Sequence, residues 1–335
     1  MRLRGTFLIL LILLFLIFTC KSFAGLNFQE KYQISPRDKI FALHFNDEKR
    51  GWAVGDRGLI LHTEDGGETW AKLEPVTDNS LNDVVFIDQN GWVVGEGGTI
   101  LHTQDGGKNW KVQDSKSDAS LFSVFFWDKQ RGVIVGERGT VLLTEDGGSS
   151  WQPSLLDWTK IIPESLIAKG IFALNLYDVF FIDGKHGWMV GDSGAVLFTS
   201  DGGKTFALLR IGSYPPLYSV FFKTDLEGWA TGASGNLLYT QDGGKNWKEL
   251  NLPTKANLFK IRMSGDKGVI VGDLGTVLQT DNGGRNWGLV KLDLRLPLPW
   301  LLDAALILHN SPEEIIFGGQ GIIKRYPLKN REEKP

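Results

Sequence analysis

Polar and apolar residues alternate along this chain in short segments that end at glycine, and the same arrangement occurs six times. The first copy is GWAVGDRGLILHTEDGGETW at 51–70, and the others follow at 91–110, 132–151, 187–206, 228–247 and 268–287. A degenerate seventh copy, EEIIFGGQGIIKRY, covers 313–326. Each copy predicts short strands, such as 81–87, 92–94 and 99–103 in the second, without the apolar stripe of a helix.

The spacing of the copies predicts the architecture. Successive copies begin 40, 41, 55, 41 and 40 residues apart. Four strands that recur at about this interval are typical of a β-propeller blade. We therefore expect an all-β fold over 25–327, a seven-bladed β-propeller with four-stranded antiparallel blades, followed by a C-terminal tail at 328–335. The last copy ends after its third strand, so we expect residues 26–34 to add the outer strand of that blade and close the ring.

The one long interval indicates an insertion of about fourteen residues, at about 152–176 between the third and fourth blades. Its apolar residues follow a mixed helical spacing and include Trp158. Two arrangements are open. The segment forms a short helix or flap over the propeller and offers a contact site, or it packs onto the third or fourth blade.

The first 24 residues have the pattern of a secretory signal. Arg2 and Arg4 precede an apolar run at 7–18, and Ser22 and Ala24 are small residues where a signal peptidase requires them. We expect cleavage after Ala24 and export from the cytoplasm, with membrane association also open. An uncleaved anchor and lipidation at Cys20 are the alternatives.

Composition excludes several classes of function. The formal charge is −3 and no basic stripe is present, so no nucleic-acid partner is expected. A single cysteine excludes an internal disulfide and a thiolate metal cluster. The five histidines show no metal-binding spacing, and we expect no metal, no cofactor and a monomer.

Each repeat contains a box with Thr, Asp, Gly and an aromatic residue at fixed spacing. Its acidic position is occupied by Asp65, Asp105, Asp146, Asp201 and Asp242, and by Asn282 in the sixth copy. The pattern resembles the Asp-box, or BNR, repeat. An aspartate here can accept backbone N–H bonds across a turn, while the ring packs between sheets. Because Asn282 keeps an acceptor and loses the charge, we expect a structural role; calcium ligation is the alternative.

A second recurrent feature is a carboxylate before glycine in the turn between the second and third strands. These residues are Asp56, Glu96, Glu137, Asp192 and Asp273, and Arg57 and Arg138 follow two of them. In a propeller such turns share a face with the segments that enter the inner strands, where we also place Asp83, Tyr177, Asp178 and Tyr218. The carboxylates cap tight turns, or the face is a polar surface that binds a partner around the channel mouth.

The full repeat, with VG, two residues, G, an apolar strand and TxDGGxxW, resembles the photosystem II stability and assembly factor family. The resemblance extends over about 26–326. It implies a non-catalytic, lumenal or periplasmic seven-bladed propeller that binds newly made reaction-centre subunits, which are membrane proteins. It also implies an arginine-bearing surface patch, for which Arg57 and Arg138 are at plausible positions.

Two other functions remain open at this stage. Asp-box propellers include sialidases and other glycoside hydrolases, which need a pair of carboxylates or a tyrosine nucleophile with an arginine cluster. Alternatively, the chain is an extracellular module that recognises a glycan or an envelope protein, with the 152–176 insertion as the first candidate for the contact.

Overall fold

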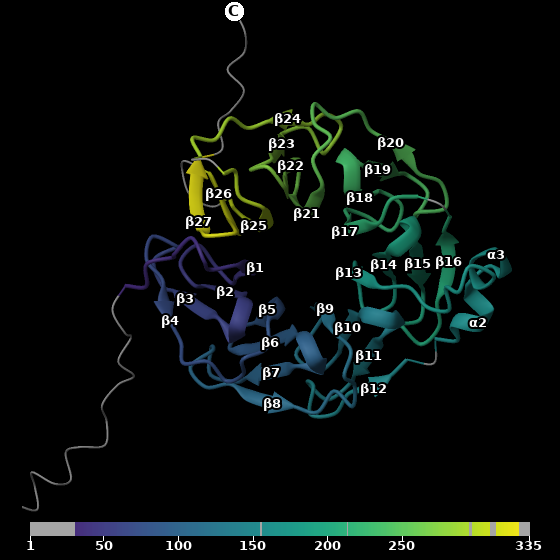
Figure 1. Cartoon of the computed structure of the whole chain (residues 1–335), viewed down its shortest axis with the longest axis horizontal. Helices are drawn as coiled ribbons and strands as arrows, with labels where there is room; N and C mark the ends of the chain where they lie inside the picture. Colours follow the sequence, from purple (N-terminus) through teal and green to yellow (C-terminus); the bar gives the residue numbers. More distant parts are fainter. Residues whose placement is uncertain (1–30, 155, 213, 295–296, 309–312, 328–335) are drawn as a thin grey trace, which may run out of the picture.

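Seven antiparallel sheets surround a central axis in a computed structural model of the chain (Figure 1). The structure describes residues 31–154, 156–212, 214–294, 297–308 and 313–327. The all-β, seven-bladed propeller predicted from the repeats is confirmed. The predicted signal peptide at 1–24 and the tail at 328–335 lie outside the described residues. Within the described ranges, no helix has the length and apolar character needed to cross a membrane.

In the first six blades, four strands follow the sequence from the axis outward (Figure 1). Blade one comprises β1 (Ile40–Phe45), β2 (Gly51–Gly55), β3 (Ile60–Thr63) and β4 (Ala71–Lys72). Blade two comprises β5 (Leu81–Ile87), β6 (Asn90–Gly95), β7 (Ile100–Thr103) and β8 (Lys111–Gln113). Blade three comprises β9 (Leu121–Phe126), β10 (Gly132–Gly136), β11 (Val141–Thr144) and β12 (Gln152–Pro153).

The later blades repeat this order. Blade four comprises β13 (Leu176–Phe181), β14 (Gly187–Gly191), β15 (Val196–Thr199) and β16 (Ala207–Arg210). Blade five comprises β17 (Leu217–Phe222), β18 (Gly228–Gly232), β19 (Leu237–Thr240) and β20 (Lys248–Glu249). Blade six comprises β21 (Leu258–Ser264), β22 (Lys267–Gly272), β23 (Val277–Thr280) and β24 (Gly288–Leu289). Blade seven comprises β25 (Leu301–Ile307), β26 (Glu314–Gly319) and β27 (Ile322–Pro327).

The ring closes differently from the sequence-based expectation. Blade seven has three strands among the described residues, and the described part of 26–34 does not join it. The Tyr32 backbone N–H donates instead to the Trp70 carbonyl of blade one, at 2.7 Å. Ile34 packs into the apolar cluster between blades one and seven. For residues 31–34 the predicted outer strand is therefore wrong, because their apolar side chains are covered there rather than left at a sheet edge.

Residues 38 and 39 form the junction that the described structure shows. Lys39 makes an antiparallel β-bridge with Gln320, and the Gly321 N–H donates to the Asp38 carbonyl at 2.7 Å. The chain start and the end of the last blade are thus tied together, which protects both edges from non-native pairing.

Aromatic stacking between neighbouring blades forms much of the core. Trp92 on β6 is fully buried and stacks on Phe126 of blade three, with ring centroids 3.6 Å apart. Its Nε1–H donates to the Gly147 carbonyl in the Asp-box of that next blade, at 3.0 Å. Trp52 on Phe86 repeats the stacking, at 3.7 Å between the ring centroids. Aromatic side chains of this size contribute about 1.5–3 kcal/mol each on burial, so the tryptophans of the second strands join the blades into one core.

The insertion between blades three and four packs against the propeller. It contains α2 (Trp158–Ile161) and α3 (Glu164–Ile167). Ile162 and Leu166 are buried in the core cluster shared by the two blades. Trp158 Nε1–H donates to the Gly139 carbonyl of blade three, at 3.1 Å. Of the two arrangements expected from the sequence, the structure shows the packed one.

Candidate functional site

The turns between second and third strands lie on one face, which we call the turn face. They include η1 (Asp56–Gly58), η2 (Glu96–Gly98), η3 (Glu137–Gly139), η4 (Asp192–Gly194) and η5 (Ala233–Gly235). The backbone N–H of the first residue in each turn donates to the carbonyl oxygen of the residue just before the inner strand. The Asp56 N–H, for example, donates to the Lys39 carbonyl at 3.0 Å. The Asp-boxes follow the third strands and so lie at the opposite end of each sheet.

The turn geometry directs the second residue of each turn outward. Arg57 and Arg138 have φ of 53° and 54°, and the following Gly58 has φ of 66°. A Cβ on Gly58 would lie 1.8 Å from the Thr77 carbonyl oxygen, so this position requires glycine. The two arginine side chains are 70% and 60% exposed. They belong to blades one and three, and Gly97 occupies the equivalent position between them on blade two.

The turn carboxylates make the contacts expected of caps. Asp192 accepts hydrogen bonds from the Asn175 N–H at 3.1 Å and the Tyr177 hydroxyl at 2.8 Å. Asp273 accepts two bonds from Asn257, both at 2.8 Å. Glu96 is exposed, and Glu137 accepts from the Ser120 N–H at 3.3 Å. These contacts support the capping interpretation, while the role of the same residues in binding a partner stays a prediction.

Below the turn face, the inner strands contribute a ring of equivalent residues around the axis. Each inner strand has a register irregularity after its first residue. The residues that follow it in the seven blades are Ala42, Asp83, Ser123, Asp178, Ser219, Lys260 and Asp303. We call this set the polar ring. Its three carboxylates are only 8%, 3% and 2% exposed.

The carboxylates of the polar ring join neighbouring blades. Asp83 accepts from the Val124 N–H at 2.9 Å, and Asp303 accepts from the Leu43 N–H at 3.0 Å. Asp178 links blade four to blade five in the same way. We had expected Asp83 and Asp178 on the turn face. The strand irregularity instead directs their side chains toward the next blade, where a buried carboxylate satisfies backbone donors.

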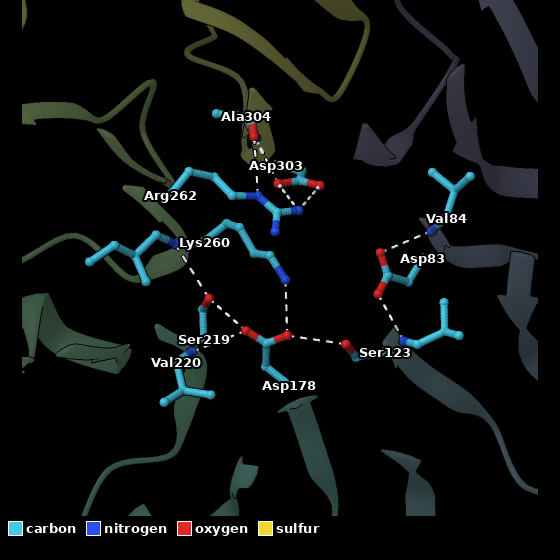
Figure 2. A network of polar contacts seen from close by, with 12 residues as sticks. Asp83, Val84, Ser123, Asp178, Ser219, Val220, Lys260, Arg262, Asp303 and Ala304 are labelled. Carbon is cyan, nitrogen blue, oxygen red and sulfur yellow. Dashed lines mark hydrogen bonds and ion pairs between the residues drawn. The ribbon is translucent and has the colours of Figure 1, made fainter. Parts of the chain in front are cut away.

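Two cations from blade six complete this network. Lys260 Nζ lies 2.9 Å from Asp178 Oδ1, and Arg262 Nη2 lies 3.1 Å from Asp303 Oδ2 (Figure 2). Burial opposes ionisation of Asp178, but Lys260 together with hydrogen bonds from blade five lowers its pKa below the usual value. Burial raises the pKa of Asp83, whose direct partners in the described structure are backbone N–H groups. An alignment of the seven inner strands would have found Lys260, because it shares the column of the three aspartates; Arg262, two residues later, lies outside that column.

The residues just before the polar ring form a partly aromatic collar at the channel mouth. They are Phe41, Asn82, Phe122, Tyr177, Tyr218, Phe259 and Leu302. The four central members lie in successive blades, and their ring centroids are 5.5, 5.6 and 5.6 Å apart. We call Phe122, Tyr177, Tyr218 and Phe259 the aromatic arc. The sequence predicts both tyrosines on this face; the two phenylalanines were not predicted there.

Exposed apolar side chains concentrate on the turn face. Ten large hydrophobic side chains are exposed among the described residues, and six of them lie in turns or connections between strands at the turn face. They are Val76, Phe172, Tyr214, Leu274, Leu298 and Trp300. The other four are Val112, Ile182, Leu226 and Leu289, in outer strands or on the opposite side. The exposed apolar side chains are therefore more numerous on the turn face than on the opposite face.

The acidic side chain of each Asp-box accepts hydrogen bonds from other residues of the same box. Asp65 accepts from the Thr63 hydroxyl at 2.8 Å and from the Thr69 N–H and hydroxyl at 2.8 and 2.6 Å. Burial opposes ionisation of Asp65, but the Thr69 bonds hold its pKa below the usual value. Asn282 accepts from Thr280 and the Asn286 N–H through Oδ1 alone. In the described parts of the chain, no three His, Cys, Asp or Glu side chains are grouped to hold a metal.

Comparisons with known proteins agree with this geometry. A model of the family described as photosynthesis system II assembly factor YCF48 matches residues 26–116, 166–255 and 209–306. A solved structure described as YCF48 bound to D1 peptide has a TM-score of 0.69 and 21% identity, covering 90% of this chain and 97% of its own. YCF48 from Cyanidioschyzon merolae has a TM-score of 0.69 and 20% identity, covering 87% and 96%.

A more distant structural neighbour is an enzyme. The GH74 xyloglucanase from Xanthomonas campestris has a TM-score of 0.68 and 11% identity, covering 88% of this chain and 52% of its own. At these identities the solved structures show the shared fold alone. No curated protein sequence matches the chain.

Proposed function

The chain belongs to the photosystem II assembly factor YCF48 family, and from this premise we propose that it binds a reaction-centre subunit of the D1 type on its turn face. In this account the protein is a non-catalytic assembly factor. The structure described as YCF48 bound to D1 peptide supports the choice of client, because it shares this fold over 90% of the chain.

One observation carries the choice of face: six of the ten exposed large hydrophobic side chains lie on the turn face. Trp300 and Leu274 are 57% and 64% exposed there. A membrane-protein client offers apolar segments before it is assembled, and an apolar surface on a rigid ring suits such a segment. Arg57 and Arg138 are exposed on turns of the same face, where they lie 3.7 and 2.7 Å from the carboxylates of Asp56 and Asp118.

A non-catalytic role is supported by the way the carboxylates are used. Glycoside hydrolases act through carboxylates that are free to protonate or attack a substrate. Asp178 and Asp303 instead accept backbone N–H bonds from the next blade and pair with Lys260 and Arg262. The xyloglucanase neighbour shares 11% identity, and the alignment covers about half of its length.

We also propose that the protein acts outside the cytoplasm, in a periplasm or thylakoid lumen. The support is the charged start and the apolar run at 7–18, which precede the small residues Ser22 and Ala24. These residues lie outside the described structure, so the proposal rests on their sequence. A client that crosses the membrane would still present segments on that side.

The test is binding of overlapping synthetic peptides that cover the D1 protein. The full chain is titrated into labelled peptides, beside a turn-face variant, Leu274→Ser with Trp300→Ser. Serine is a matched replacement at 274, because Ser193 and Ser234 occupy the equivalent turn position with similar φ. The control variant is Leu226→Ser with Leu289→Ser, which removes side chains 53% and 51% exposed away from the turn face.

We expect at least one D1 peptide to bind the wild-type chain and the control variant with equal affinity. The turn-face variant should bind it at least about tenfold more weakly, which corresponds to about 1.4 kcal/mol. Failure of every peptide to bind the wild-type chain would overturn the proposed function. Equal binding by all three proteins would overturn the choice of face.

A further inference from the structure

The aromatic arc presents four rings in a row at the channel mouth. Phe122, Tyr177, Tyr218 and Phe259 occupy one register position on β9, β13, β17 and β21. Neighbouring rings are inclined to each other by 36°, 63° and 48°. All four side chains are partly exposed. The arc therefore keeps aromatic surface accessible at the centre of the turn face.

Negative charge borders the arc. Asp192 accepts from the hydroxyl of Tyr177 in the arc at 2.8 Å, and Asp273 accepts from Asn257, two residues before Phe259 of the arc. Burial, and then the charges of these two carboxylates, raise the pKa of Tyr218. The hydrogen-bond donors to these carboxylates are neutral groups on Asn175, Tyr177 and Asn257. Among the described residues, neither carboxylate has a cation within ion-pair distance. The arc is thus bordered by two carboxylates whose charge is not neutralised.

The polar ring beneath the arc contains its own cations. Three carboxylates, Asp83, Asp178 and Asp303, lie near two cations, Lys260 and Arg262 (Figure 2). Lys260 and Arg262 lie at ion-pair distance from Asp178 and Asp303. Asp83 is left with backbone donors, and its burial disfavours the ionised form. The paired charges of this layer therefore balance, and the two carboxylates beside the arc, Asp192 and Asp273, are the ones that attract positive charge.

The same face already contains one example of the expected contact. The Arg210 guanidinium lies over the Tyr214 ring, 3.9 Å from its centroid. Its Nη1 donates to the Gly194 carbonyl at 2.6 Å, in the turn beside Asp192. This surface therefore already holds a guanidinium over a tyrosine ring, with one turn carbonyl as its hydrogen-bond acceptor.

We propose that the aromatic arc binds one cationic side chain, lysine or arginine, of the client peptide. The proposal rests on the proposed function and specifies its chemistry: the ring faces contact the cation, and Asp192 and Asp273 supply opposite charge. An acidic peptide segment is repelled from this mouth. Arg57 and Arg138 are on the turns that follow the second strands, outside the inner strands that carry the arc. In this proposal they contact other parts of the client.

The experiment uses the full chain and the D1 peptide that binds it most tightly. Each arginine of that peptide is replaced in turn by citrulline, and each lysine by glutamine, so that shape is kept and charge is lost. The protein variants are Tyr218→Leu, which removes the aromatic ring, and Tyr218→Phe, which keeps it. Affinities are measured for every pair of peptide and protein at two salt concentrations.

We expect one neutral replacement to weaken binding at least about tenfold and to reduce its salt dependence. Tyr218→Leu should weaken binding of the original peptide by a similar factor and should have little further effect on binding of the neutral peptide. Tyr218→Phe should bind the original peptide with the wild-type affinity. If a D1 peptide binds but no neutral replacement matters, this inference is overturned and the proposed function stands. If no D1 peptide binds the wild-type chain, both are overturned.

Discussion

The carboxylate of Asp178 in blade four accepts a hydrogen bond from the backbone N–H of Val220 in blade five, at 3.0 Å. Its oxygens also accept hydrogen bonds from the side chains of Ser219, Ser123 and Lys260, which lie on the inner strands of blades five, three and six. One aspartate thus connects blades three, four, five and six at the axis. The ring that carries the turn face is held together by this buried polar network as well as by stacked aromatic residues.

Removing the Asp178 carboxylate should destabilise the whole ring. In Asp178→Ala, Lys260 is left buried without its counter-ion, and we expect the free energy of unfolding to fall by about 3–5 kcal/mol. Urea unfolding followed by tryptophan fluorescence measures the change. Asp178→Ala combined with Lys260→Met should recover part of the loss, because no unpaired charge remains.

The control for this prediction is Glu96→Gln, which changes an exposed carboxylate on the turn of blade two. We expect its free energy of unfolding to stay within about 0.5 kcal/mol of the wild type. An Asp178→Ala protein that unfolds at the same urea concentration as this control would show that the polar ring does not stabilise the fold.

The Asp-boxes offer a reciprocal pair of substitutions. Asp105 accepts from the Asn109 side chain through Oδ2 at 2.7 Å, whereas Asn282 has a single side-chain oxygen facing the matching Asn286. Asn282→Asp should therefore stabilise the protein, and Asp105→Asn should destabilise it, each by about 1 kcal/mol. Shifts of the urea midpoint with the same sign in both variants would contradict the structural account of the boxes.

His44 should make stability depend on mildly acidic pH. Burial on β1 lowers the His44 pKa to about 4, and Arg262 opposes its protonation while Asn46 and Asp303 favour it. The unfolded chain takes up this proton near pH 6.5 and the folded chain near pH 4, so stability is present above pH 6.5 and is lost as pH falls toward 4. His44→Gln should flatten this part of the urea midpoint curve. Parallel curves for wild type and variant would contradict the assignment.

The predicted signal peptide has a direct consequence for the natural protein. Cleavage after Ala24 leaves Gly25 as the first residue, so the protein isolated from its own cells should have the mass of 25–335. Intact-mass measurement and N-terminal sequencing test this. A chain that begins at Met1, or one that begins at a lipid-modified Cys20, would support the alternatives instead.

Much of the fold could be predicted because the repeat is a local pattern. The box residues, such as Thr63 and Asp65, bond to one another within a few positions, so their spacing alone determines the turn. The turn residues Arg57 and Gly58 likewise have a backbone geometry that the G-x-x-G sequence requires. These features place the turn face without any knowledge of contacts between blades.

The centre of the molecule could not be predicted in the same way. Asp83 and Asp178 look in the sequence like polar residues at a strand entry, and only the irregular register after Leu81 and Leu176 directs them to the next blade. Lys260 lies 82 residues from Asp178 in the sequence. The position of Tyr32 was also missed, because its contact with Trp70 depends on how the first and last blades meet.

The most direct test of the central claim is hydrogen–deuterium exchange of the full chain with and without its tightest D1 peptide. We expect slower exchange in the turn-face segments around Asp192, Tyr218 and Leu274, with no change in the Asp-box segments at the opposite end of the blades. Protection confined to the Asp-boxes, or to the outer strands, would contradict the claim that the turn face holds the client.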